Sequence, residues 1–318
     1  MKNYTPIVDC EYGPLDPKVN LEPDFFTGFE PAKRQEIITM EAAFYRSLTA
    51  PYSVDAKLKK SYIDIMTRDG KVRVKVYRPK NTEGALPAFV FIHGGGFVTC
   101  SVETHDFVPT YIAANTNIIA FSIEYSLAPE HKFPKGINDC FDVLKWISEN
   151  ADALGVDPTR ITVGGDSSGA NFTIALTLME KAYGSSMINK QVLIYPVTDM
   201  SNTIRKQSAE VYKLVGSMDE EGVALNAVFD NYTEPGTDSK DPLISPLLAN
   251  DLSNLPEALF IEAECDALLD DGLIYAKCLQ DAGVKVSFYI YKGMPHAFIL
   301  RTYEETFDAL EKICDFLR

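Results

Sequence analysis

The chain has 318 residues, of which 46% are hydrophobic and 24% are charged, and its formal net charge is −15. This length and composition suit one large core, either alone or with an appended cap. Because so acidic a surface repels nucleic acid and anionic membranes, we expect neither as a partner. The six cysteines form no C-x-x-C pair, which argues against structural zinc and disulfides and favours reduced thiols in a cytoplasm.

The first ten residues lack the apolar core of a secretory signal, and apolar runs such as 86–92 are far too short to cross a bilayer. The first 31 residues contain five prolines and are predicted to be irregular, with a helix following from Pro31 to about Leu48. We interpret residues 1–57 as an N-terminal segment in front of the main domain, which spans residues 58–318.

Period-two alternation on both sides of Arg68-Asp69-Gly70 predicts an opening β-hairpin. After it, continuous apolar runs that suit strands buried on both faces alternate with helical patterns. The predicted strands are 61–67, 71–77, 87–92, 117–123, 160–164, 191–195, 258–263 and 284–291, and the later helices are 137–150, 168–183, 219–232, 270–282 and 303–317. This order indicates an α/β fold with a mostly parallel, eight-stranded sheet flanked by helices.

The segment from about 198 to 246 interrupts this alternation with polar loops and a single helical stretch. Ligand sites of such sheets lie beyond the carboxyl ends of the strands. We therefore expect this insertion and residues 1–57 to form a helical cap over that edge. The alternative is an excursion that packs on the side of the domain.

Ser167 stands at the apex of Gly165-Asp166-Ser167-Ser168-Gly169, between a predicted strand and a predicted helix. This context gives a G-x-S-x-G match its meaning, because the sharp turn holds the serine above the sheet where a base can reach it. Glycines two positions away on either side let the strand and helix approach without a Cβ clash. The motif predicts a serine hydrolase.

A nucleotide site is the weaker interpretation of the same turn. A dinucleotide fingerprint needs glycine at position 166, where the pyrophosphate approaches the backbone, and Asp166 has both a side chain and the wrong charge. The glycines that follow His93 lack the required spacing as well, and no G-x-x-x-x-G-K-[ST] is present.

A serine hydroxyl needs an adjacent base, and histidine is the usual one because its pKa lies near ~6.5. In sheets of this kind the chain order is serine, then acid, then histidine. Only one of the four histidines, His296, follows Ser167, and it lies in a loop after the last predicted strand. We expect His296 to be the base.

The acid must lie between Ser167 and His296 and follow a strand. Asp266 meets both conditions and would hold His296 in the required tautomer. Glu264 is close to its strand, while Asp270 and Asp271 fall in the first turn of a helix, where carboxylates complement the helix dipole. Asp241, before Pro242, is a further candidate.

Three glycines, Gly94, Gly95 and Gly96, follow a buried strand directly after His93. Consecutive glycines let backbone N–H groups point inward, and with the N–H of Ser168 they would form an oxyanion hole. The sequence does not decide which two donate, although we favour Gly95 and Gly96. We expect His93 to support the loop backbone and not to act as a second base.

These motifs together resemble the hormone-sensitive-lipase-like branch of the α/β-hydrolases, which includes bacterial and plant carboxylesterases. The matching stretches, spread over residues 60 to 318, are His93-Gly-Gly-Gly-Phe97, Glu124-Tyr-Ser-Leu-Ala-Pro-Glu-His-Lys-Phe-Pro134, Gly165-Asp-Ser-Ser-Gly169, Asp241-Pro-Leu-Ile-Ser-Pro246, the Asp266 segment and Gly293-Met-Pro-His-Ala-Phe298. Ser168 stands where the family usually has alanine, and Ala170 and Ala297 replace common glycines. The segment 266–270 also departs from the family pattern, but no catalytic group is lost.

The resemblance implies the same triad of Ser167, Asp266 and His296, an N-terminal cap, and hydrolysis of small-molecule esters with short to medium acyl chains. It implies no cofactor and no metal, and it suggests a homodimer formed through the edge of the sheet. Two alternatives stay open. One is a small-molecule receptor without catalysis, which the presence of His296 disfavours, and the other is amide hydrolysis by the same triad.

Overall fold

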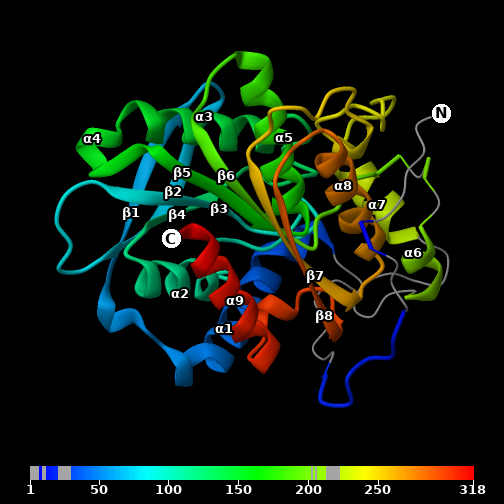
Figure 1. Ribbon diagram of the computed structural model, residues 1–318, viewed down its shortest axis with the longest axis horizontal. Helices are drawn as coiled ribbons and strands as arrows, with labels where there is room; N and C mark the ends of the chain where they lie inside the picture. Colours follow the sequence, from blue (N-terminus) through cyan, green and yellow to red (C-terminus); the bar gives the residue numbers. More distant parts are fainter. Residues whose placement is uncertain (1–6, 9–11, 21–29, 202, 205, 213–222) are drawn as a thin grey trace.

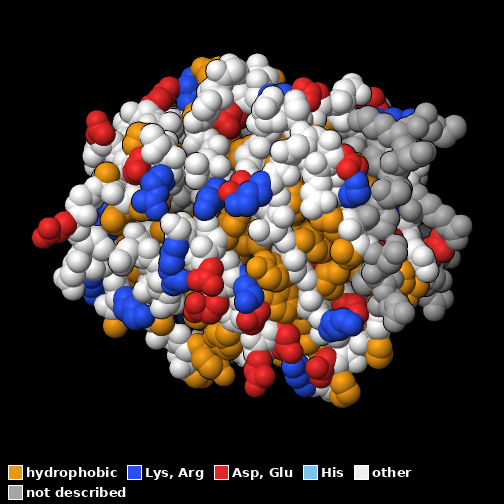
Figure 2. All heavy atoms as spheres, in the orientation of Figure 1, with side chains coloured by type: hydrophobic (Ala, Val, Ile, Leu, Met, Phe, Trp, Pro, Cys, Tyr) orange, Lys and Arg blue, Asp and Glu red, His pale blue; other side chains and the backbone are white. Residues whose placement is uncertain are grey.

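The computed structural model describes residues 7–8, 12–20, 30–201, 203–204, 206–212 and 223–318. A central sheet lies between two groups of helices (Figure 1). Figure 2 shows charged side chains of both signs interspersed over one face of the molecule, with apolar side chains gathered near its centre.

The sheet has eight strands in the order β1-β2-β4-β3-β5-β6-β7-β8. β2 pairs antiparallel with β1 and β4, and the other neighbouring pairs are parallel. The strands are β1 (Leu58–Thr67), β2 (Gly70–Pro79), β3 (Leu86–Ile92), β4 (Ile119–Glu124), β5 (Val156–Asp166), β6 (Ile188–Ile194), β7 (Glu257–Cys265) and β8 (Val286–Pro295). The predicted eight-stranded, mostly parallel sheet with an antiparallel start is confirmed.

Two helical layers cover the faces of the sheet, because the central strands are apolar on both sides. In β3, Val90 belongs to the core formed with α3 and α5, whereas Phe91 belongs to the opposite core with α2 and α9. The helices are α1 (Arg34–Thr49), α2 (Phe107–Thr116), α3 (Lys135–Glu149), α4 (Ala151–Leu154), α5 (Ser168–Tyr183), α6 (Gln207–Val211), α7 (Val223–Tyr232), α8 (Leu269–Asp281) and α9 (Glu304–Leu317).

Most predicted boundaries agree with the structure to within a few residues, and α5 begins and ends where the sequence predicted. β5 is longer than predicted because Val156 pairs with Leu86 of β3. The helix predicted over 219–232 corresponds to α7, which begins at Val223, and residues 219–222 lie outside the described residues.

The sequence did not predict α2. This helix contains Pro109 and is apolar on nearly every side, so its pattern has no amphipathic period. Pro109 lies in the first turn, where a missing N–H breaks no hydrogen bond within the helix. Val108 and Ile112 are fully buried against the sheet, so burial and not amphipathicity accounts for the helix.

The turn between β5 and α5 brings two backbones into direct contact. A Cβ placed on Gly169 would lie 2.0 Å from the carbonyl oxygen of Ile92 in β3, and one on Gly165 would lie 2.4 Å from the same oxygen. No side chain fits these distances, so both positions require glycine. The glycines that the motif places on either side of Ser167 therefore fix how closely α5 approaches the sheet.

We predict that Gly169→Ala lowers the free energy of unfolding by about 3 kcal/mol, because the new methyl group meets backbone that cannot move aside cheaply. Gly236→Ala is the control, since Gly236 has φ +88 but open space around its Cβ position. That change should cost only about 1 kcal/mol. Urea denaturation of both variants measures the difference, and equal losses would contradict the steric explanation.

Candidate active site

Ser167 follows the last residue of β5, and α5 begins at the next residue. Its backbone has φ 54 and ψ −119, a conformation that an L-residue adopts only under strain. The Ser167 N–H donates to the carbonyl of Ile194 in β6 at 2.9 Å, which helps to hold the turn. The strained turn leaves Ser167 partly exposed at the carboxyl edge of the sheet.

The structure brings Asp266 and His296 to Ser167. Each follows the end of a strand, β7 for Asp266 and β8 for His296, so the three side chains share one edge of the sheet. His296 Nε2 lies 3.0 Å from Ser167 Oγ, and His296 Nδ1 lies 2.6 Å from Asp266 Oδ2. With the proton on Nδ1, the ring donates to Asp266 and Nε2 is free to accept from the serine hydroxyl.

The other carboxylates considered as the acid have different partners. Glu264 Oε2 accepts the N–H of Gly293 at 2.8 Å, and Asp241 Oδ1 accepts the N–H of Leu243 at 2.9 Å. In the first turn of α8, Asp270 accepts from Tyr12 and Ser208, and Asp271 accepts from Thr198 and pairs with Lys206. The contact to His296 thus comes from Asp266.

Two opposing effects act on the pKa of His296. Burial lowers it, but the charge of Asp266 and the hydrogen bond to it, with a smaller contribution from Asp166, raise it above its ordinary value. Asp266 is 3% exposed, so water screens this interaction little. The arrangement therefore strengthens His296 as an acceptor for the serine proton.

The loop of Gly94, Gly95 and Gly96 lies next to Ser167. The N–H of Gly94 donates to Asp166 Oδ1 at 2.9 Å and so is not available to an oxyanion. The prediction of Gly94 as an oxyanion donor is therefore wrong. Gly95 and Gly96 have positive φ values of 113 and 57, and within the described part of the chain their N–H groups have no acceptor. The N–H of Ser168 lies in the first turn of α5, where it lacks a partner within the helix.

Sequence reasoning missed the pair of Asp166 and His105. Both are buried, and His105 Nε2 lies 3.3 Å from Asp166 Oδ2 while Thr104 Oγ1 lies 2.8 Å from His105 Nδ1. Burial alone would raise the pKa of Asp166, but His105 and the N–H of Gly94 outweigh it and lower the pKa. The only signal was an aspartate inside the serine motif in a chain with four histidines.

His93 supports the loop, in line with the expectation from the sequence. It is fully buried, its Nδ1 lies 2.7 Å from the carbonyl oxygen of Gly94, and its ring stacks on Tyr125 at 4.3 Å. Burial, together with the nearby His105, lowers the pKa of His93 to about 3. The fourth histidine, His131, is exposed on the surface.

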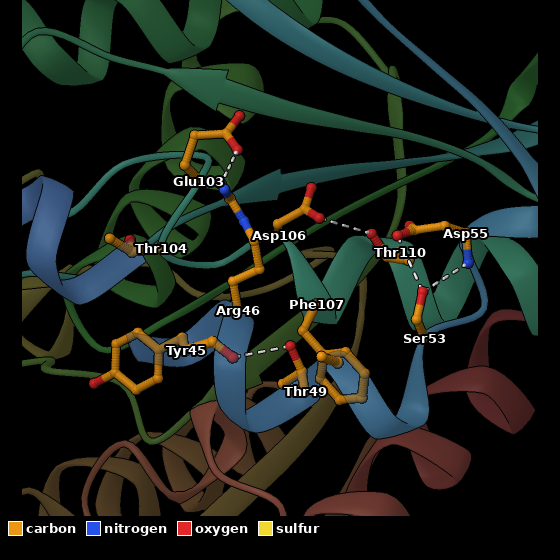
Figure 3. A pocket seen from close by; sticks show the side chains of 11 residues that line it. Tyr45, Arg46, Thr49, Ser53, Asp55, Glu103, Thr104, Asp106, Phe107 and Thr110 are labelled. Carbon is orange, nitrogen blue, oxygen red and sulfur yellow. Dashed lines mark hydrogen bonds and ion pairs between the residues drawn. The ribbon is translucent and has the colours of Figure 1, made fainter. Parts of the chain in front are cut away.

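A separate pocket of about 180 Å³ lies between α1 and the start of α2 (Figure 3). Arg46 reaches across it to Glu103, and Asp55 and Asp106 are paired with Lys60. Neither Ser167, Asp266 nor His296 lines this pocket. It is therefore distinct from the site around the serine.

Membrane-spanning helices and metal-binding clusters are both absent from the described residues. No helix there combines the length and the apolar character needed to cross a membrane. No group of three or more histidine, cysteine, aspartate or glutamate side chains there is arranged to hold a metal ion.

A strained serine between a parallel strand and a helix, with a histidine and a carboxylate from later strand ends, defines the class of α/β serine hydrolases. The model of the α/β hydrolase fold family matches residues 89–300. The chain belongs to this family, in the hormone-sensitive-lipase-like branch that its motifs predicted.

Several relatives of the chain are named as ester hydrolases. It is 36% identical to an ethyl acetate hydrolase of Pseudomonas putida over 75% of both chains. It is 32% identical to an arylesterase of Saccharolobus solfataricus over 73% of this chain and 77% of the relative. A solved structure, a hyperthermophilic esterase from Pyrobaculum calidifontis, superposes with a TM-score of 0.85 at 33% identity, covering 96% of this chain and 98% of that one.

We predict that Asp266→Asn lowers the pKa of His296, because burial then acts without the opposing charge of Asp266. At a pH between the two values, the ring is protonated with Asp266 in place and neutral in the variant. NMR titration of the histidine C–H signals, in a Ser167→Ala background, measures this shift. Asp241→Asn is the control and should leave the titration unchanged, and a shift in that variant instead would make Asp241 the partner.

Proposed function

We propose that this chain is a serine carboxylesterase in which Ser167 is the nucleophile, His296 the general base and Asp266 the acid that orients it. One observation carries the proposal, namely the continuous contact from Asp266 through His296 to Ser167, with distances of 2.6 Å and 3.0 Å. The strained backbone of Ser167 and the esterase names of the relatives support the same conclusion.

The proposed reaction proceeds through an acyl-enzyme. Ser167 Oγ attacks the ester carbonyl carbon while its proton moves to His296 Nε2. The carbonyl oxygen becomes an oxyanion, which the N–H groups of Gly95, Gly96 and Ser168 would stabilise. His296 then returns the proton to the leaving alkoxide, and the alcohol departs. Water repeats the sequence on the acyl-enzyme and releases the carboxylic acid.

The base must be neutral when it accepts the serine proton. Activity should therefore fall as the pH drops through the pKa of His296, and the raised pKa places this loss at a higher pH than for an isolated histidine. The positive end of α5, which begins at Ser168, would further stabilise negative charge on the substrate oxygen.

Residues 1–57 and the insertion at about 198–246 together form the proposed cap. Three contacts support this assignment. Arg34 Nη2 donates to the carbonyl of Ala128 at 2.5 Å, and Glu41 of α1 is buried beside Cys100, just after the glycine loop. Tyr212 Oη donates to the carbonyl of Gly13 at 2.7 Å, which joins the two segments.

The proposed substrates are esters with short to medium acyl chains, in line with a relative named for ethyl acetate. Among the aromatic residues of the proposed cap, Phe25, Phe26 and Phe29 lie outside the described residues. Phe229 is partly buried, whereas Tyr212 and Tyr232 are buried. Cytoplasmic location and a homodimer stay predictions.

The receptor alternative requires that the histidine or its contact be lost. Here His296 is present and lies within hydrogen-bond distance of Ser167 Oγ, which favours catalysis over binding alone. Amide hydrolysis would use the same groups in the same order, so the choice between ester and amide depends on measurement.

Replacing Ser167 by alanine should lower turnover of an aryl ester on the order of 10⁴–10⁶-fold, because the acyl-enzyme no longer forms. With short-chain 4-nitrophenyl esters, the unmodified enzyme should release a burst of nitrophenol stoichiometric with the enzyme. Asp266→Asn should cost about 10⁴-fold through the wrong histidine tautomer. Turnover in Ser167→Ala near the original rate would contradict the proposed nucleophile.

An ester and an amide that share one acyl group separate the two hydrolase activities. We expect kcat/KM for the ester to exceed that for the anilide by at least about 10³-fold, because the anilide nitrogen is the poorer leaving group. Parallel steady-state assays with a butyryl ester and the matching anilide measure the ratio. Comparable values would identify the chain as an amidase.

A further inference from the structure

Phe97, which follows the glycine loop, is held in an unusual backbone conformation. Its φ is 65, in the left-handed region that side chains rarely occupy, and the residue is 2% exposed. Such strain persists only where the surroundings fix the residue from several sides. Phe97 directly follows Gly96, so its position constrains the glycine loop that carries the N–H groups of Gly95 and Gly96.

Both backbone groups of Phe97 are engaged. Its N–H donates to Ser168 Oγ at 3.3 Å, and its carbonyl accepts the N–H of Ala128 at 3.0 Å. The first bond ties the glycine loop to the residue after the nucleophile, through a hydroxyl that alanine would lack. The position of the glycine loop relative to the turn at Ser167 is thus fixed by the Ser168 side chain as well as by backbone packing.

The ring of Phe97 packs between α5 and the insertion, against Phe172, whose centroid lies 5.1 Å away, and against Tyr232. It stacks on Tyr232 at the end of α7, with centroids 4.0 Å apart and planes 11° apart. Tyr232 is itself anchored, since its carbonyl accepts the N–H of Phe133 at 2.7 Å, and Lys132 Nζ donates to the next carbonyl, that of Thr233, at 2.6 Å. The stacked rings therefore connect the glycine loop to a part of the insertion that is itself hydrogen-bonded to the main domain.

The hydroxyl of Tyr232 takes no part in this anchoring. Tyr232 is 2% exposed, and its buried hydroxyl has no hydrogen-bond partner in the described part of the chain. A buried hydroxyl without a partner costs stability. The contact with Phe97 is made by the aromatic ring of Tyr232, so phenylalanine at this position should preserve it.

We propose that Tyr232 is a positioning residue for the oxyanion hole, acting from the inserted segment through the ring of Phe97 on the N–H groups of Gly95 and Gly96. The proposal rests on the proposed function of the same site. Donors that are aimed at the oxyanion before it forms need no rearrangement during the reaction, so even a small misalignment weakens transition-state binding. Ground-state substrate binding depends on them much less.

The test compares Tyr232→Leu with Tyr232→Phe as the matched control. In Tyr232→Leu we expect kcat for a 4-nitrophenyl ester to fall about 10- to 100-fold with KM changed less than about threefold, a loss somewhat below that of a deleted oxyanion donor. Affinity for a trifluoromethyl ketone, which forms an oxyanion at Ser167, should fall in parallel. Tyr232→Phe should keep both values within about twofold, since it retains the stacked ring.

Hydrogen exchange gives a readout that is independent of activity. The amide of Phe97 donates to Ser168 Oγ, and those of Val98 and Thr99 donate to the carbonyl of Gly95. All three should exchange faster in Tyr232→Leu but not in Tyr232→Phe. If Tyr232→Leu fails to fold, Ser168→Ala removes another of the contacts that hold Phe97 and should lower kcat about fivefold, with faster exchange of the same amides.

Each outcome has one meaning. Unchanged kcat, inhibitor affinity and amide exchange in a folded Tyr232→Leu would overturn the proposal while leaving Ser167-dependent hydrolysis intact. Equal losses in Tyr232→Phe and Tyr232→Leu would also overturn it, because the hydroxyl would then be the acting group. If the unmodified chain shows no Ser167-dependent hydrolysis, the proposed function itself fails, and the exchange data still decide whether Tyr232 orders the loop.

Discussion

The site depends on the direct contact between the start of α5 and the end of β3. Gly169 lies so close to the carbonyl of Ile92 that no side chain fits between them. This approach forces the sharp turn in which Ser167 adopts φ 54, and it places Ser168 beside the glycine loop that follows β3. The proposed nucleophile and the proposed oxyanion donors are therefore both positioned by this contact, and a change in the packing of α5 would displace both.

Two buried carboxylates near this contact each pair with a histidine, Asp266 with His296 and Asp166 with His105, and the two pairs have different roles. Asp266 raises the pKa of His296, which faces the serine hydroxyl. Asp166, beside His105, accepts the N–H of Gly94 and so fixes the start of the glycine loop. Because both carboxylates are shielded from water, each acts on a nearby group more strongly than a surface charge would. The first pair supports the proposed proton transfer and the second holds the backbone that surrounds it.

The proposed cap is joined to this centre at several places and not only laid over it. In α1, Glu41 lies against Cys100, and at the end of α7, Tyr232 stacks on Phe97, so both cap segments contact the loop that follows the glycines. Burial raises the pKa of Glu41, while His105 lowers it by less, and the resulting pKa is about 7. This is consistent with a carboxyl group enclosed between α1 and the loop. In this arrangement the segments that would enclose substrate also bear on the groups that would stabilise its transition state.

The sequence alone determined the sheet and the order of its elements, and it singled out Ser167, Asp266 and His296, which the structure brings together. These inferences follow from local patterns and from chain order. The sequence left the glycine donors open and missed α2 and the Asp166–His105 pair. Those features depend on contacts between residues far apart in the chain. Gly94 is excluded as an oxyanion donor because its N–H binds a carboxylate 72 residues away. The apolar segment α2 is a helix because it is buried between the sheet and α9. Local periodicity indicates the secondary structure of a segment that has one apolar face. Hydrogen-bond partners and buried surfaces are decided only when segments far apart in the chain pack together.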